Sequence, residues 1–188
     1  MPPIADILRA AFGAGRLALR DPAGMAFFDM SFEGFWRSFF AYVLVAPPFL
    51  ILALLRHEGE GHDVGVFALA KVLSYGASVV VFPVAMIAIS LAFNLRAHYV
   101  PFIIAYNWSQ IVVMGVALPV ALFGAVLALP PAIELGLSLA VLVWALYYLW
   151  FIARVALQAN AQLAAAVTAL EFALSYFVQS AVESWFMP

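Results

Sequence analysis

Three side chains that could hold a proton, an ion or a polar solute interrupt the apolar stretches of this chain, namely Lys71, Gln110 and Glu171. A single charge at the centre of a bilayer costs at least about 2.5 to 3.5 kcal/mol, so Lys71 and Glu171 each require a partner or water. Counted from the nearer end of its own stretch, each of the three lies within about one helical turn of the same depth. We therefore expect Lys71 and Glu171 to face each other beside Gln110. The polar residues expected to complete this intramembrane cluster are Ser74, Asn107 and Ser175.

Three interpretations of the cluster are open. Intramembrane ionisable residues often mark a route for protons, ions or small solutes. The same residues could instead form a structural clasp that holds three helices in register, at about 0.6 to 2 kcal/mol for each hydrogen bond. In the third interpretation, Lys71 extends towards the membrane surface and Glu171 is protonated without a partner.

Other kinds of chemistry find little support in the residue types. The chain has no cysteine, which excludes disulfides, thiolate metal ligands and cysteine nucleophiles. His57 and His62 are five residues apart in a glycine-containing loop, a spacing that does not match a helical zinc motif. Together with His98 they lie outside the apolar stretches, where a haem would need facing ligands. We therefore predict no metal, no cofactor and no enzymatic activity.

The elements that must position the cluster are membrane spans. Hydrophobic residues make up 68% of the 188 residues and charged residues 10%, which places the chain among membrane proteins. A net charge of -2, with the basic residues scattered singly, argues against a nucleic-acid partner. The sequence predicts an all-α, polytopic membrane protein with five transmembrane helices, at about residues 34–55, 64–93, 101–129, 133–153 and 161–186.

The first 30 residues have a different pattern. Residues 4–20 place three arginines between apolar residues at helical spacing, and this stretch is too short and too charged to span a bilayer. We expect an N-terminal amphipathic helix on the membrane surface, although a docked or frayed terminal helix would have the same pattern. The chain therefore divides into a lead helix with its linker, residues 1–30, and a transmembrane domain, residues 31–188.

The last apolar stretch is the one around which we expect the bundle to be organised. Glu171, Ser175, Gln179 and Glu183 recur every four residues and form one row on a helix. A different face carries a second row, made of the small residues Ala161, Ala165, Ala169 and Ala173. Small residues let helices approach closely in lipid, and polar ones seek partners on other helices. We therefore predict that this helix contacts protein on two sides.

The charges predict the orientation, because five spans place the two termini on opposite sides. With a cytoplasmic N-terminus, the outer side holds only two basic residues, Arg56 and the more deeply placed Lys71. An excess of Lys and Arg on the cytoplasmic side is the usual rule, which predicts an N-in, C-out topology. The basic residues on the inner side are then Arg9, Arg16, Arg20, Arg37, Arg96 and Arg154.

Five closely spaced spans behind an N-terminal amphipathic helix resemble the Yip1-domain type of small membrane protein, which has bacterial relatives. The Asp-Leu-Tyr-Gly-Pro element of the eukaryotic members is missing, so the resemblance implies neither functional residues nor a role in vesicle traffic. Many Ala, Gly and Arg residues with few Lys are typical of a GC-rich bacterial proteome. This composition predicts a multi-pass protein of the bacterial inner (cytoplasmic) membrane.

Two functions follow as hypotheses. The first is a subunit, adaptor or organiser of a membrane assembly that acts by helix packing, with the lipid bilayer and a membrane-protein partner or a second copy as its contacts. The alternative is a transporter or channel component for a small solute, an ion or a proton that uses Lys71, Glu171 and Gln110. A lipid-processing enzyme is a more distant third.

Overall fold

The computed structural model describes residues 1–55 and 63–186, and all regular secondary structure in that part of the chain is helical. Within these residues, five helical segments are long and apolar enough to cross a membrane, which confirms the predicted number. The helices before the spans are α1 (Ile4–Ala18) and the short 3-10 helix η1 (Pro22–Phe27). The spans are α2 with α3 (Phe32–Ser38, Phe40–Leu55), α4 (Val64–Ala92), α5 (Arg96–Val126), α6 (Pro131–Ala156) and α7 (Ala161–Phe186).

Side-chain caps begin some of the helices, and the prolines inside the spans do not interrupt them. The Asp63 carboxylate accepts a hydrogen bond of 2.8 Å from the Gly65 backbone N–H and so begins α4. The third span begins at Arg96, before Pro101, and it continues as a helix through Pro119. In the first span the helix continues through Pro47 and Pro48, and its break lies earlier, at Phe39.

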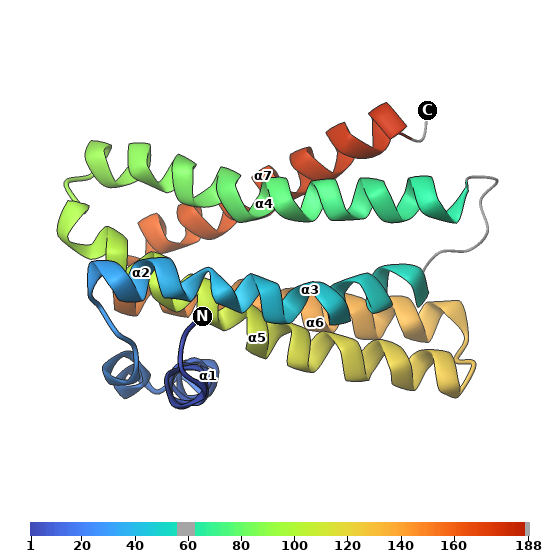
Figure 1. The fold of residues 1–188 in the computed structure, drawn as a ribbon, viewed down its shortest axis with the longest axis horizontal. Helices are drawn as coiled ribbons and strands as arrows, with labels where there is room; N and C mark the ends of the chain where they lie inside the picture. The colour runs from blue at the N-terminus through green and yellow to red at the C-terminus, as the bar shows by residue number, and fades with distance from the viewer. Residues whose placement is uncertain (56–62, 187–188) are drawn as a thin grey trace.

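The spans pack as a bundle with α5 on one side and α7 on the other (Figure 1). Helix α5 packs against α3, α4 and α6, whereas α7 packs against α4 and α6. In Figure 1, α7 runs obliquely, starting beside the end of α6 and leaning away from the bundle towards its C-terminal end. Because α4 and α7 run in opposite directions along each other, the start of α4 lies near the end of α7.

The most enclosed helix is α5, and the prediction that α7 forms the centre is wrong. Every residue from Phe102 to Ser109 is buried, because α1, α2, α3, α4 and α6 all pack around α5. Helix α7 buries a single narrow face, and its predicted packing row points outwards. The alanines of that row, all exposed, are Ala161, Ala165, Ala169 and Ala173.

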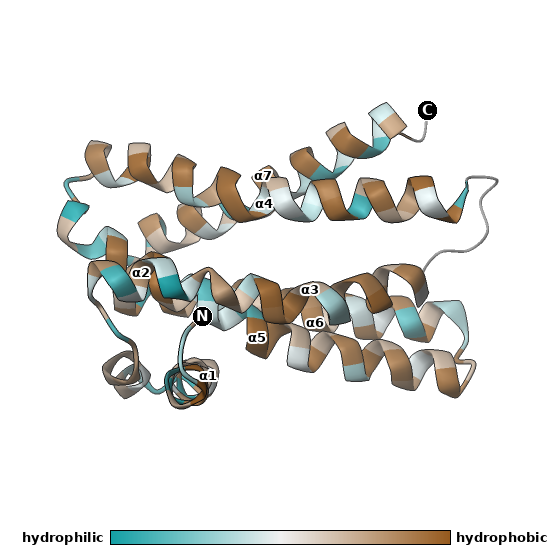
Figure 2. Ribbon diagram, in the orientation of Figure 1, coloured by the Kyte–Doolittle hydropathy of each residue, from teal (hydrophilic) through white to brown (hydrophobic). Residues whose placement is uncertain are grey.

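The outer surface of the spans is apolar, as a lipid environment requires. Hydrophobic residues extend along α3 to α7, whereas hydrophilic residues concentrate near α1 and α2 and at the turn between α4 and α5 (Figure 2). Large exposed hydrophobic side chains occur on each of the five spans. In water, exposing so large an apolar area would be costly, whereas in a bilayer the lipid chains contact this area directly.

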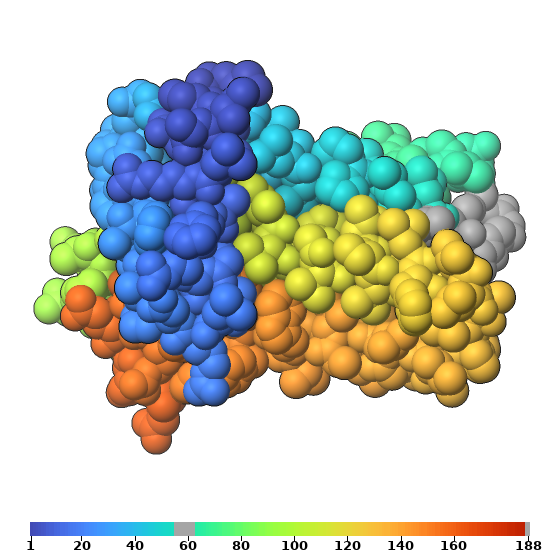
Figure 3. All heavy atoms as spheres, turned by 90° about the horizontal axis from the view of Figure 1, so that it is seen from below, coloured from blue at the N-terminus to red at the C-terminus, as the bar shows by residue number. Residues whose placement is uncertain are grey.

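Helix α1 lies across one end of the bundle. It is seen end-on in Figure 1, while the spans run across the view, and Figure 3 shows α1 and the following segment covering the side of α5 and α6. Ala14 and Leu17 are fully buried there, and the Tyr148 hydroxyl of α6 donates a hydrogen bond of 2.6 Å to the Ala14 carbonyl. The opposite face exposes Ile4, Leu8 and Phe12.

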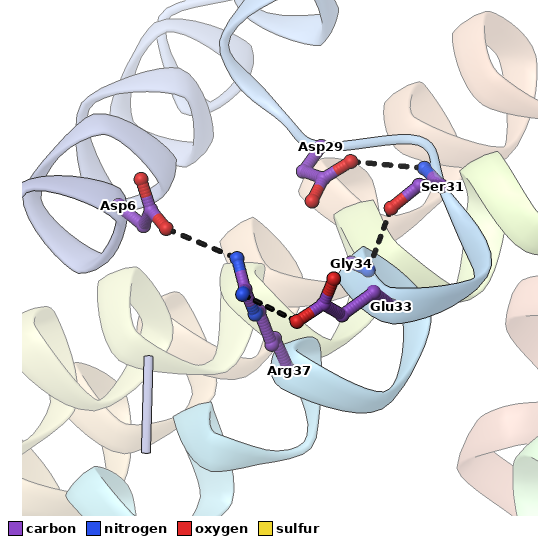
Figure 4. Close-up of polar contacts among 6 residues, drawn as sticks. All are labelled: Asp6, Asp29, Ser31, Glu33, Gly34 and Arg37. Atoms are coloured by element: carbon purple, nitrogen blue, oxygen red, sulfur yellow. Dashed lines mark hydrogen bonds and ion pairs between the residues drawn. The ribbon is translucent and has the colours of Figure 1, made fainter. Parts of the chain in front are cut away.

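A group of charged side chains ties α1 to the start of the first span (Figure 4). Arg37 of α2 lies between two carboxylates, 3.3 Å from Asp6 of α1 and 2.5 Å from Glu33. Ser31 caps α2 by accepting a hydrogen bond of 3.0 Å from the Gly34 backbone N–H. Hydrogen bonds from Ser31 lower the pKa of the nearby Asp29 carboxyl. These contacts keep α1 at right angles to the spans.

A second group of contacts holds the turn between α1 and η1 in place. Asp21 forms an ion pair with Arg16 and accepts a hydrogen bond of 2.9 Å from the Ala23 backbone N–H. These contacts hold the pKa of the Asp21 carboxyl below its ordinary value, and the backbone hydrogen bond from Ala23 makes the largest contribution. Arg20 adopts a left-handed backbone, with φ of 65°, at the turn that ends α1.

Candidate functional site

Glu171 lies on α7 with its carboxylate turned towards α5. It accepts one hydrogen bond of 3.1 Å from the Tyr106 hydroxyl and another of 3.1 Å from Ser175, one turn further along α7. Within residues 1–55 and 63–186, the ion pairs formed by lysine and arginine do not include Glu171. Its carboxylate is therefore held by hydroxyl dipoles and retains the capacity to bind a proton or a cation.

Two cavities meet at Glu171. One, of about 300 Å³, lies between α5, α6 and α7, and the other, of about 230 Å³, lies between α3, α4, α5 and α7. Ligand sites in proteins usually have volumes of this order or larger. The side chains that line both cavities are Tyr106, Gln110, Val113, Glu171, Ser175 and Gln179.

Four of the six residues predicted for the polar cluster are brought together here. Ser74, Gln110, Glu171 and Ser175 all line the cavity between α3, α4, α5 and α7. The Ser74 hydroxyl donates to the Ala70 carbonyl at 2.9 Å, so it serves its own helix as well as the cavity wall.

The predicted pairing of Lys71 with Glu171 is wrong. The Lys71 ammonium lies 2.5 Å from the carboxylate of Glu183, three turns further along α7, and Gln179 donates to the same carboxylate at 2.9 Å. The side chains of Lys71 and Glu183 are 14% and 34% exposed. This pair joins the start of α4 to the end of α7, beyond the cavities.

Asn107 also lies apart from the cavities. Its side-chain amide is fully buried and donates a hydrogen bond of 2.8 Å to Ser38 of α2, whose hydroxyl donates in turn to the Phe35 carbonyl at 2.7 Å. Among the described residues, the side-chain oxygen Oδ1 of Asn107 has no hydrogen-bond partner. This contact fixes α2 against α5 and supplies no group to the site around Glu171.

The site contains tyrosines that were not predicted as members of the cluster. Tyr75 of α4 lines the same cavity as Ser74, and its hydroxyl donates a hydrogen bond of 2.7 Å to the Tyr42 carbonyl of α3. The Tyr42 hydroxyl lies next to Tyr106 without a hydrogen bond of regular geometry. Tyr106 precedes Gln110 by one helical turn, so spacing could have identified it, whereas Tyr42 stands alone in an apolar stretch and carries no such signal.

The described residues contain no cluster of metal-ligating side chains. No group of three or more His, Cys, Asp or Glu side chains arranged to hold a metal ion occurs within residues 1–55 and 63–186. The loop with His57 and His62 lies outside the described residues.

Comparison with protein-family models, with curated proteins and with solved structures gives no match. The resemblance to the Yip1-domain type therefore stays a prediction from the arrangement of the spans.

Proposed function

We propose that the chain is a multi-pass protein of a bacterial inner membrane, with its N-terminus in the cytoplasm and α1 on the cytoplasmic surface. The end of the bundle that carries α1 and α2 also carries Arg96 and Arg154, near the start of α5 and the end of α6. The opposite end, in the described residues, carries Asp63, Glu134 and the Lys71–Glu183 pair. This asymmetry supports the N-in, C-out orientation.

The function that the geometry supports best is binding and passage of a small solute or a proton at Glu171. A single observation carries this proposal: a carboxylate well inside a membrane span lines two cavities and has hydroxyls, rather than a cation, as its partners. A clasp accounts for the hydrogen bond between Tyr106 and Glu171 but not for two cavities beside a carboxylate that has no cation as its partner among the described residues, because an unpaired carboxylate costs stability in a bilayer. A carboxylate that has to bind and release a proton or a ligand needs to lack a permanent cation partner, which would explain this loss of stability.

The residues that line the cavities indicate how such a site would operate. Hydroxyls of Tyr106 and Ser175 orient the Glu171 carboxylate, and the Gln110 side chain lines the same space. A proton or solute entering from the C-terminal end of α7 would pass Gln179, which lines both cavities one turn beyond Ser175. The Lys71–Glu183 pair lies past this point and holds α4 against α7 at that end.

Proton flux into liposomes tests the proposal. The purified chain is reconstituted with a pH-sensitive dye inside the vesicles, and a membrane potential drives proton entry. We expect flux with the unchanged chain and with Glu33→Gln, a change at the membrane surface, and loss of flux with Glu171→Gln. Equal flux with Glu171→Gln, in a preparation that melts at the same temperature as the unchanged chain, would refute the proposal.

A packing role for α7 is the second candidate, and the exposed alanine row favours it. Small residues on an exposed helix face permit close approach of another helix in lipid, and a second copy of the chain is the simplest partner. The chain has no native cysteine, so single cysteines report such contacts directly. We expect Ala169→Cys to form a disulfide-linked dimer in membranes under mild oxidation and the buried Ala164→Cys to form none. Failure of both Ala165→Cys and Ala169→Cys to cross-link would remove this candidate.

A further inference from the structure

We infer that the solute of the Glu171 site is an organic cation with an apolar body, reached in part from the bilayer. The inference rests on the proposed function, since it assumes that the cavities at Glu171 receive a solute. Three features of the walls support it: the sign of the charge, the aromatic rings around that charge, and an apolar groove adjoining the cavity.

Glu171 gives both cavities their charge. Among the described residues that line them, Glu171 is the only one with a charged side chain, and the remaining polar groups are hydroxyls and amides. An anion would meet a carboxylate with no cation to compensate it, so the walls select against negative solutes. A small metal ion is also a poor match, because Mg²⁺ and Ca²⁺ prefer six or more oxygen ligands around one point.

Aromatic rings line both cavities next to this carboxylate. In the cavity between α3, α4, α5 and α7 the rings are those of Tyr42, Phe49, Tyr75 and Tyr106. In the cavity between α5, α6 and α7 they are those of Tyr106, Tyr148, Phe172 and Tyr176. The face of an aromatic ring attracts organic cations, and quaternary ammonium ligands are commonly bound by several rings together. Rings combined with one carboxylate therefore favour a weakly hydrated, bulky cation.

An apolar groove adjoins the first of these cavities. It has a volume of about 260 Å³, lies between α3 and α5, and includes Leu44, which is 39% exposed on the outer surface of the span. Val45 and Met114 line both the groove and the cavity, so the two spaces adjoin at these side chains. Met is flexible and adapts to different ligands. We assign the groove to the apolar body of the same cation.

The prolines of α3 and α5 leave two backbone carbonyls of groove-lining residues without their usual helical donors. Pro48 and Pro119 have no backbone N–H, so the carbonyls of Leu44 and Gly115, four residues earlier, lose their usual helical donor. Leu44, Pro48, Gly115 and Pro119 all line the groove. Carbonyl oxygens without a donor are costly in lipid, and a nearby cation would compensate part of that cost.

Two probes of the same shape and opposite charge test the inference. Binding of tetraphenylphosphonium and of tetraphenylborate to the full chain in nanodiscs is measured by equilibrium dialysis against empty nanodiscs. We expect saturable binding of the cation alone and a loss of affinity of about tenfold or more in Glu171→Gln, because the cation then lacks its counter-charge. Glu134→Gln, which changes an exposed carboxylate at the start of α6 outside both cavities, should keep the affinity within about twofold.

Aromatic variants show which cavity receives the cation. Tyr176→Leu and Phe49→Leu each remove a ring from one cavity, and we expect one of them to weaken binding of tetraphenylphosphonium about two- to tenfold. Unchanged affinity in both variants, equal binding of the two probes, or full binding by Glu171→Gln would each overturn the inference. The comparison of the two probes uses the unchanged chain, so it decides the matter even if Glu171→Gln does not fold.

Proton flux separates failure of this inference from failure of the proposed function. If flux depends on Glu171 but tetraphenylphosphonium neither binds nor inhibits it, the site serves protons or polar solutes and the organic cation is wrong. If flux is also independent of Glu171, both proposals fail.

Discussion

Gly13 and Gly24 set the distance between α1 and η1. A Cβ atom on Gly13 would lie 2.8 Å from the Gly24 carbonyl oxygen and 2.8 Å from Phe27 Cβ. A Cβ atom on Gly24 would lie 2.5 Å from the Gly13 carbonyl oxygen. All three distances are shorter than van der Waals contact, and the atoms approached include backbone oxygens that cannot rotate away. The linker can therefore fold back on α1 only with glycine at both positions.

Gly13→Ala should release η1 from α1. We expect destabilisation of about 1 to 3 kcal/mol, the usual cost of overpacking, together with faster hydrogen exchange in residues 4–27. Gly15→Ala is the matched control, because nothing lies within 4 Å of a Cβ atom at that position. This control should be stabilising by about 0.5 to 1 kcal/mol through helix propensity. Equal melting temperatures and exchange rates for the two variants would show that the close approach is not needed.

Some residues of the site could be predicted from the sequence by their type alone. Polar residues in apolar stretches are rare, so Ser74, Gln110, Glu171 and Ser175 were identifiable, and the structure places all four around one cavity. The tyrosines were harder to identify because tyrosine is compatible with core, interface and lipid positions alike.

At the scale of helices, the length of α4 and α7 explains the partner of Lys71. The two helices have 29 and 26 residues, more than the roughly 20 that a hydrocarbon core requires. Lys71 lies near the start of α4, and antiparallel packing places that point beside the end of α7, where Glu183 lies. The prediction compared the depths of Lys71 and Glu171, counted from opposite ends of their spans, and did not pair Lys71 with Glu183.

Breaking this pair should loosen α4 from α7. Glu183→Gln leaves Lys71 unpaired inside the membrane region, and we expect a destabilisation of roughly 1.5 to 3 kcal/mol, the range for hydrogen bonds to charged groups. The double variant Lys71→Met with Glu183→Gln should lose less, because no uncompensated charge is left behind. Thermal unfolding in nanodiscs provides both values. A double variant that is less stable than either single variant would contradict a pairwise contact.

Hydropathy predicts where a helix crosses the membrane but not which face meets its neighbours. The five spans were predicted to within a few residues, since length and apolar content decide them. The alanine row of α7 was expected to pack inside the bundle and instead lies on the outside. Small residues suit a helix contact wherever the contact forms, so the row cannot indicate whether the partner is the same chain.

At the scale of the whole molecule, the two ends of the bundle differ in charge, and this difference carries the proposed orientation. Single cysteines report it, because the chain has none of its own. We expect a membrane-impermeant maleimide to label Ala132→Cys, at the start of α6, in intact spheroplasts and to label Ala23→Cys, in η1, only after permeabilisation. The reverse pattern would place the N-terminus outside.

The central claim is that the space around Glu171 is open to water or solute, and cysteine reactivity at Ser175 tests it most directly. Ser175 lines both cavities, Thr168 is buried at 8% exposure, and Ala173 lies on the exposed outer face of α7. A small cationic methanethiosulfonate is applied to membranes that carry each single cysteine. We predict that Ser175→Cys reacts at least about tenfold faster than Thr168→Cys and Ala173→Cys, because only a hydrated thiol ionises readily. If Ser175→Cys reacts as slowly as these two, the cavities are closed to solute and Glu171 has a structural role.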